Sequence, residues 1–195
     1  MQGLIFIFVS TYTLSWAQPP DIQKLYGIPE KGYRWPKGVV PYVVGPKFNE
    51  NELDFIKAAI KAFRIHTCIK FIKRSGQKDY ISIEKKPTGC WSSLGRRGGM
   101  QKLNLQKECL LTPGPVMHQL MHTIGFLHEH NRSDRDKYVK INFKNIIPGQ
   151  EVNFQKWNNT EHFGLPYDYD SITHYSTKAF SRNNKTTIKA RVRRI

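Results

Sequence analysis

The sequence predicts an α+β fold, with a mixed sheet and two helices in its first part and an irregular second part. Two helical patterns and four short runs of strand-forming residues support this prediction. The first helical pattern spans Asn51 to Phe63 and the second spans Val116 to Ile124. After Gly125 the regular patterns give way to loops and short elements, which suits a loop-built second lobe. The 195 residues are enough for one domain with a substantial hydrophobic core.

Four short segments predict the strands, because each is rich in strand-forming residues and is bounded by Gly, Pro or Ser. They are Val39 to Val44, Ile69 to Ile72, Tyr80 to Glu84 and Met100 to Leu105. The first helix has its apolar residues on one face and is expected to pack on this sheet, with Asn49 or Asn51 as its N-cap.

The second helix carries two histidines at positions i and i+4, His118 and His122. This spacing places both side chains on one face of a helix, where their ring nitrogens can bind one metal ion. Gly125 tolerates a positive φ angle and can end the helix in a sharp turn that returns His128 to the same point. Three neutral histidines with an open fourth position are typical of a catalytic zinc site.

These eleven residues, His118 to His128, resemble the zinc signature H-E-x-x-H-x-x-G-x-x-H of the metzincin peptidases, with Gln119 at the position of the glutamate. The run that follows, up to Asp136, contains R-x-D-R-D and resembles the astacin branch. Further stretches resemble the same family: Arg34 to Tyr42, His66 to Phe71, Gly95 to Gln101 and Tyr167 to Tyr175. The chain therefore resembles the astacin family of metzincin zinc metalloendopeptidases from about Arg34 to about Phe180.

This resemblance implies a two-lobed metzincin-like catalytic domain, with a mixed upper sheet, two long helices, an irregular lower lobe and a zinc cleft between the lobes. It implies one catalytic Zn²⁺ ion held by His118, His122 and His128, and hydrolysis of peptide bonds by water that the zinc activates. Tyr175 would stabilise the oxyanion that forms during hydrolysis. Extended peptides or proteins would be the substrates or ligands.

Gln119 decides whether such a chain is an enzyme. In this chemistry a carboxylate beside the zinc accepts a proton from water and passes it to the leaving amine, which a neutral amide cannot do. General-base assistance contributes about 100- to 10,000-fold in rate, so the activity is expected to be strongly impaired. Three interpretations stay open: a metalloendopeptidase of very low turnover, an inactive pseudoprotease that binds extended peptides or a protein partner, and a sequencing or gene-model error at this position.

Other positions also depart from the family pattern. Thr173 stands where the Met-turn of the family has methionine, so a small void and a hydroxyl in need of a partner are expected. The resemblance pairs Cys90 with Cys109 and leaves Cys68 without its usual partner. We therefore expect Cys68 to be free, or else the natural chain to be longer than this sequence, whose domain would then be truncated at its C-terminus. A buried unpaired thiol that acts as a small hydrophobe is the alternative. The resemblance also makes Glu129 the partner of the matured N-terminal amino group.

The first seventeen residues contain an apolar run and end in small residues, which predicts a secretory signal peptide cleaved after Ala17. Residues 18–33 then form a short segment without a typical propeptide, and residues 34–195 form the peptidase domain. The apolar run is too short for a stable anchor, and no other segment could span a bilayer. The protein is expected to be secreted and extracellular.

The net charge is +16, from 31 Lys and Arg against 15 Asp and Glu. Such a charge attracts polyanions. No nucleic-acid-binding motif accompanies it, and the predicted signal peptide leads outside the cell, so no nucleic acid partner is expected. Acidic glycans or acidic substrate segments are the more sensible partners, and a solvated basic face is the alternative.

The resemblance also implies that Gly95 to Gln101 forms the strand edge along which an extended substrate lies. The alternative is that Gly98 and Gly99 form a flexible turn between two strands. Three N-x-S/T sequons begin at Asn131, Asn158 and Asn184 and are weak glycosylation signals. The closeness of Asn131 to the metal ligands argues against its occupancy.

Overall fold

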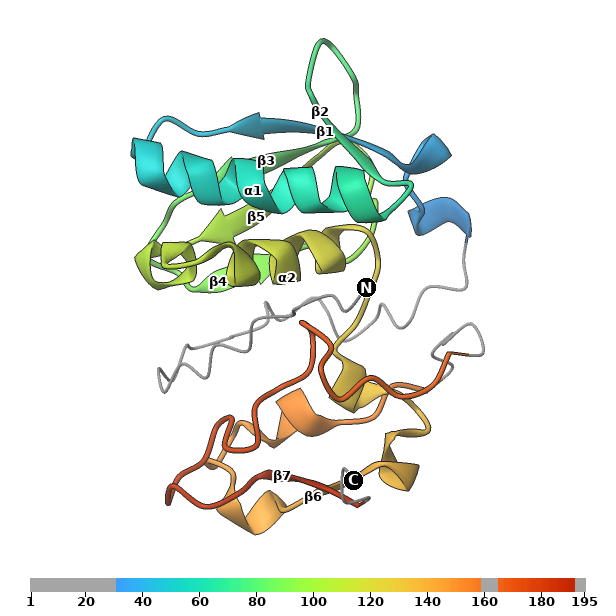
Figure 1. Cartoon of the computed structure of the whole chain (residues 1–195), viewed down its shortest axis with the longest axis vertical. Helices are drawn as coiled ribbons and strands as arrows, with labels where there is room; N and C mark the ends of the chain where they lie inside the picture. Colours follow the sequence, from blue (N-terminus) through green and yellow to red (C-terminus); the bar gives the residue numbers. More distant parts are fainter. Residues whose placement is uncertain (1–30, 159–164, 192–195) are drawn as a thin grey trace, which may run out of the picture.

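The computed structural model describes residues 31–158 and 165–191, so the predicted signal peptide and its cleavage site lie outside the described residues. Figure 1 shows two parts: an upper part with a sheet and two helices, and a lower part of loops, short helical turns and two short strands. The predicted α+β architecture with an irregular second lobe is confirmed.

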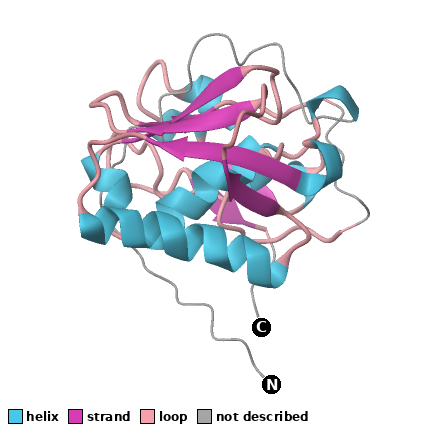
Figure 2. Cartoon of the chain, turned by 90° about the horizontal axis from the view of Figure 1, so that it is seen from above, coloured by secondary structure: helices cyan, strands magenta, loops and turns pink. Residues whose placement is uncertain are grey.

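The sheet of the upper part has five strands in the order β2-β1-β3-β5-β4. They are β1 (Val39–Val44), β2 (Lys70–Lys73), β3 (Tyr80–Glu84), β4 (Cys90–Ser92) and β5 (Met100–Leu105). β1 pairs in parallel with β2 and β3, and β3 pairs in parallel with β5, whereas β4 is antiparallel to β5. β2 and β4 are therefore the two edges of a mixed sheet. Figure 2 shows the long helix lying along one side of this sheet.

The predicted strands match β1, β3 and β5 and lie one residue from β2, but β4 was not predicted. The expectation that Gly95 to Gln101 forms the strand edge is wrong. Three of its glycines adopt positive φ angles of 64°, 83° and 66°, which makes the segment up to Gly99 a turn between β4 and β5. Gln101 already belongs to β5, an inner strand, so the edge on this side of the sheet is β4.

Helix α1 (Glu50–His66) begins with a complete capping box. The Asn49 side chain accepts a hydrogen bond from the Glu52 backbone at 3.0 Å, and the Glu52 carboxylate accepts one from the Asn49 backbone at 2.9 Å. Of the two N-cap candidates, Asn49 is therefore confirmed. Ile56, Ala59 and Phe63 lie one helical turn apart and bury the inner face of α1 against the sheet and α2.

Helix α2 (Pro113–Thr123) begins three residues earlier than predicted, with a proline at its first position. Val116 and Leu120 are fully buried in the upper core, and the indole of Trp35 donates a hydrogen bond to the Thr123 carbonyl at 2.8 Å. Gly125 follows with a φ angle of 105°, and its backbone N–H donates to the His122 carbonyl at 2.9 Å. The predicted glycine turn after this helix is confirmed.

The lower part has a hydrophobic core of its own, which the sequence did not predict. The buried side chains of this core are Val139, Ile146, Phe154, Tyr167, Tyr175 and Ile188. Two short strands, β6 (Val139–Ile141) and β7 (Ile188–Ala190), pair in the antiparallel direction and each contributes to it. The lower lobe is thus irregular in secondary structure but packed around a defined centre.

Candidate metal centre

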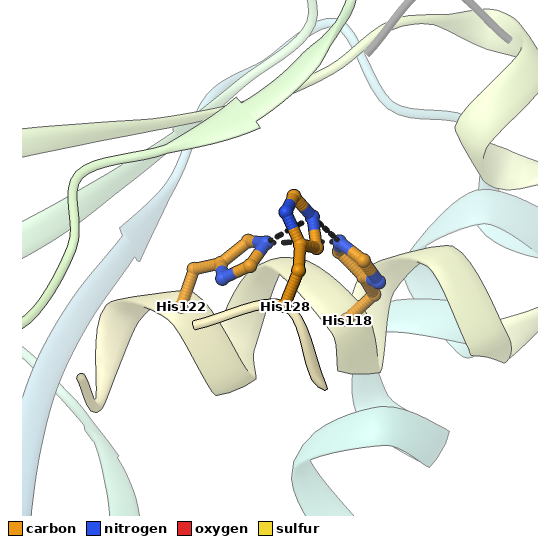
Figure 3. Close-up of side chains that lie close together, drawn as sticks. All are labelled: His118, His122 and His128. Carbon is orange, nitrogen blue, oxygen red and sulfur yellow. Dashed lines mark hydrogen bonds between the residues drawn. The ribbon is translucent and has the colours of Figure 1, made fainter. Parts of the chain in front are cut away.

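His118, His122 and His128 meet at the point where the two parts of the chain join. The first two lie one turn apart on α2, and the third follows the turn at Gly125. Figure 3 shows the three rings close together. The Nε2 atoms of His118 and His122 are 2.9 Å apart, and each lies 3.2 Å from the Nε2 atom of His128. The three rings are buried and form a group able to hold one metal ion.

Two backbone carbonyls orient the rings of His118 and His122. His118 Nδ1 lies 2.8 Å from the carbonyl oxygen of Ile172, and His122 Nδ1 lies 2.7 Å from that of Phe126. A carbonyl only accepts, so each Nδ1 carries the proton and each Nε2 presents a lone pair. Burial lowers the pKa of His118 to about 3 and of His122 to about 4, and it holds the pKa of His128 well below its ordinary value.

This arrangement fits a zinc ion. Neutral imidazoles with outward Nδ1–H groups bound to carbonyls are the usual form of zinc-binding histidines. Nitrogens at about 2.05 Å from a tetrahedral zinc ion are roughly 3.3 Å apart, close to the separations observed here. At these separations the unprotonated Nε2 atoms of His118 and His122 would repel each other without a cation between them. The sequence prediction of one zinc ion therefore agrees with the donor set.

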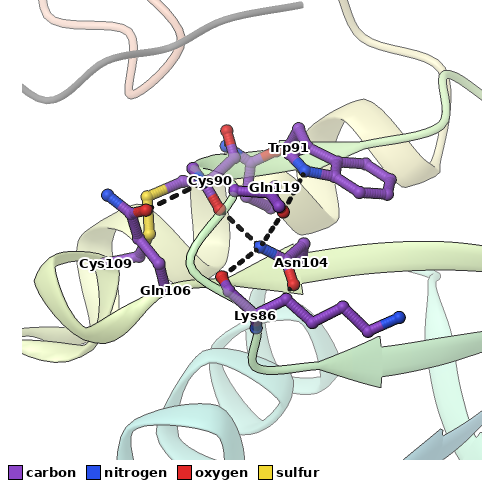
Figure 4. The surroundings of a disulfide bond; sticks show 9 residues. Lys86, Cys90, Trp91, Asn104, Gln106, Cys109 and Gln119 are labelled. Carbon is purple, nitrogen blue, oxygen red and sulfur yellow. Dashed lines mark hydrogen bonds between the residues drawn. A yellow bond between two sulfur atoms is a disulfide. The ribbon is translucent and has the colours of Figure 1, made fainter. Parts of the chain in front are cut away.

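Gln119 lies on α2 beside the first histidine and is 1% exposed. Its side-chain nitrogen donates a hydrogen bond to the Cys90 carbonyl of β4 at 3.3 Å, and Figure 4 shows the side chain beside this strand. Its side-chain oxygen has no hydrogen-bond partner among the described residues. The residue thus offers one buried acceptor and no group that takes up a proton near neutral pH.

Tyr175 comes from the lower core and reaches the histidines. Its ring centre lies 4.7 Å from that of His128 and 4.0 Å from that of His130, on which it stacks. Its hydroxyl is buried without a hydrogen-bond partner among the described residues, and burial raises its pKa. The nearby Thr173 is 2% exposed, and its hydroxyl lies 3.1 Å from that of Ser171, which is the partner that this hydroxyl was expected to need.

Sequence reasoning missed how the R-x-D-R-D run builds the lower part. Arg132 donates to both carboxylate oxygens of Asp134 and to Glu129. Arg135 is 4% exposed and donates to the backbone carbonyls of His130 and Phe154. In the sequence, the charged residues of this run served only to indicate the family. The buried arginines bind carboxylates and backbone carbonyls of the lower part, which indicates a structural role.

The Glu129 carboxylate also accepts a hydrogen bond from the Asp168 backbone at 2.9 Å. Its predicted partner, the matured N-terminus, lies outside the described residues. The predicted Cys90–Cys109 disulfide is present, and Figure 4 shows how it links β4 to the short turn before α2. Cys68 is free and exposed among the described residues, so its interpretation as a buried hydrophobe is wrong. The side chain of Asn131 is buried and donates to two carbonyls, which leaves no room for a glycan there.

The two-part fold and the three-histidine group define a domain of the zinc-peptidase class. Residues 27–195 match the model of the peptidase family described as Astacin. The chain belongs to the astacin family. High choriolytic enzyme 1 of Oryzias latipes is 46% identical over 143 residues, which cover 73% of this chain and 52% of that protein. Zinc metalloproteinase nas-6 of Caenorhabditis elegans is 44% identical over 161 residues, which cover 82% of this chain and 46% of that protein.

A solved structure supports the same relationship. High choriolytic enzyme 1, a hatching enzyme zinc-protease from Oryzias latipes, superposes with a TM-score of 0.75 at 42% identity, covering 81% of this chain and 80% of that chain. The structure of myroilysin matches with a TM-score of 0.57 at 15% identity, which shows a shared fold alone. The chain spans about half the length of the curated relatives it matches. Within the described residues, no helix is long and apolar enough to cross a membrane.

Proposed function

We propose that this chain is a secreted, zinc-binding astacin-type protein in which peptide-bond hydrolysis is strongly impaired. The observation that carries the proposal is Gln119, a neutral amide beside an intact group of three histidines. The metal-binding and proton-transfer functions reside on different side chains, so the loss of one leaves the other in place.

Each residue of the centre has a separate role in this proposal. His118, His122 and His128 would hold a zinc ion, which would supply a Lewis acid to polarise a substrate carbonyl and to make water a stronger acid. The side-chain oxygen of Gln119 accepts a hydrogen bond from water and so orients it, but does not remove its proton. The Tyr175 hydroxyl, kept protonated by burial, donates a hydrogen bond to a developing oxyanion.

Metal content and peptide cleavage test the proposal on the purified full chain. Mass spectrometry of the metals should find one zinc ion per chain, and a chelator should remove it. Cleavage of fluorogenic peptides should be far slower than in a variant with a carboxylate at position 119. A chain that holds less than a tenth of an equivalent of zinc, yet is folded by circular dichroism, contradicts the proposed metal centre.

A second candidate function is the capture of extended peptides without cleavage. It is favoured by β4, whose outer edge has no strand partner within residues 31–158 and 165–191 and whose Cys90 carbonyl contacts Gln119. Such an edge offers main-chain groups that can pair with a peptide of any sequence. Calorimetric titration of the zinc-loaded chain with peptides that it does not cleave tests this function. Measurable binding supports capture, and the absence of binding excludes it.

The same proposal includes secretion, with cleavage after Ala17. It also includes an extracellular peptidase domain over residues 34–195. Support comes from the apolar N-terminal run and from the disulfide, because disulfides persist in oxidising compartments. Expression with a C-terminal tag and N-terminal sequencing of the medium should find Gln18 as the first residue; intact Met1 on retained protein would contradict secretion.

A further inference from the structure

The lower part of the molecule carries a basic surface distant from the metal centre. Two segments without Asp or Glu build it, residues 137–150 with three lysines and residues 171–191 with five Lys or Arg. Figure 1 shows β6 and β7, which belong to these segments, at the end of the lower part that lies farthest from α2. This end of the molecule is therefore strongly positive.

The fold brings the two segments together at two places. The pairing of β6 with β7 sets Lys140 directly opposite Lys189. Beside this pair, the Arg182 backbone donates to the Asn145 carbonyl at 2.9 Å, which places Arg182 next to Lys144 in the neighbouring segment. All four cations are exposed, and none of them forms an ion pair within the described residues.

The positive charges of Lys140 and Lys189 repel each other across the β6–β7 pair. Like charges directly opposite each other on one face of an antiparallel pair destabilise it, since their Cβ atoms lie about 5 Å apart. Val139 and Ile188 are buried on the inner face, so a shift of one residue in the register would expose them to water. The register therefore holds the two lysines together and concentrates positive potential at this point.

We propose that this surface, centred on Lys140 and Lys189, binds a sulfated polysaccharide. Exposed Lys and Arg side chains form charge-assisted hydrogen bonds with sulfate oxygens, and the adjacent turn adds the polar side chains of Ser181 and Asn183. Nucleic acid is the weaker candidate, because the predicted signal peptide leads outside the cell. The partner class rests on the proposed secretion and is independent of hydrolysis.

Heparin binding measured against salt concentration tests this surface on the full chain. A double variant, Lys140→Gln with Lys189→Gln, should lower the slope of log affinity against log salt by about two, at roughly one unit per lost contact. The matched control carries Lys70→Gln and Lys73→Gln on the opposite lobe, with the same change of charge, and should retain most of the slope. Zinc content reports that both variants are folded.

Three results would overturn the proposal. The first is an equal loss in both double variants, which would show that the net charge alone attracts heparin. The second is an unchanged affinity for desulfated heparin, since the sulfate groups are the proposed ligands. The third is tighter binding of a DNA duplex than of heparin at equal salt, with the same loss in the β6–β7 variant, which would make the surface a nucleic-acid site.

Discussion

Replacing Gln119 with glutamate should raise the rate of peptide cleavage and lower the stability of the domain at the same time. The amide of Gln119 donates to the Cys90 carbonyl at 3.3 Å in a site that is 1% exposed. A carboxylate has no proton to donate at neutral pH, so this hydrogen bond is lost and two oxygens face each other. Loss of one partner of a buried hydrogen bond costs about 1–3 kcal/mol, or a fall of roughly 3–9 °C in melting temperature.

The gain in rate has a different origin. A glutamate beside the zinc ligands restores a general base, which contributes about 100- to 10,000-fold, or roughly 3–5 kcal/mol of the barrier. The assay compares kcat/KM on a fluorogenic peptide for the original chain, Gln119→Glu and the control Gln119→Ala, each loaded with zinc. The alanine control removes the hydrogen bond without adding a base and should lose stability without gaining rate. Equal rates for the original chain and Gln119→Glu, at equal zinc content, would refute this reasoning.

Three further predictions concern the metal, the disulfide and the first helix. His122→Ala removes one of three ligands and should abolish stoichiometric zinc binding, as measured by metal analysis after dialysis; retention of a full equivalent would contradict the assigned ligand set. Replacing both Cys90 and Cys109 with serine opens a loop of 19 residues and should lower the free energy of unfolding by roughly 3 kcal/mol in urea titrations. The hydrogen bond from Lys85 holds the pKa of Glu52 below its ordinary value of 4.5. Because the folded-state pKa is the lower one, this contribution is present above pH 4.5 and is lost as the pH falls, so the stability difference from Glu52→Gln should shrink in acid.

The sequence predicted those elements whose pattern is local. The apolar spacing of α1 and the strand-forming composition of β1, β3 and β5 are properties of single segments, and the structure agrees with each. β4 has only three residues, and it is a strand because it pairs with β5. β6 and β7 are equally short and lie far apart along the chain, so their pairing could not be inferred from either segment alone.

The metal centre could also be predicted from the sequence only in part. The spacing of His118, His122 and His128 carries the information that they share a metal, because helix geometry and one glycine turn suffice to bring them together. The groups that orient the rings of His118 and His122 are backbone carbonyls, those of Ile172 and Phe126. Every residue has a carbonyl, so no side chain in the sequence marks these two partners.

The carbonyl of Ile172 also connects the metal centre to the packing of the two parts of the chain. This residue belongs to the lower part, whereas His118 lies on α2 in the upper part, so the ring of His118 joins the two parts. His128 extends the link, since its ring contacts Tyr175 of the lower core. A zinc ion bound to all three histidines would add its binding energy to the folding of both parts together. Metal binding would thus have a structural role that does not depend on Gln119, and this role fits the proposed combination of an intact zinc site with impaired proton transfer.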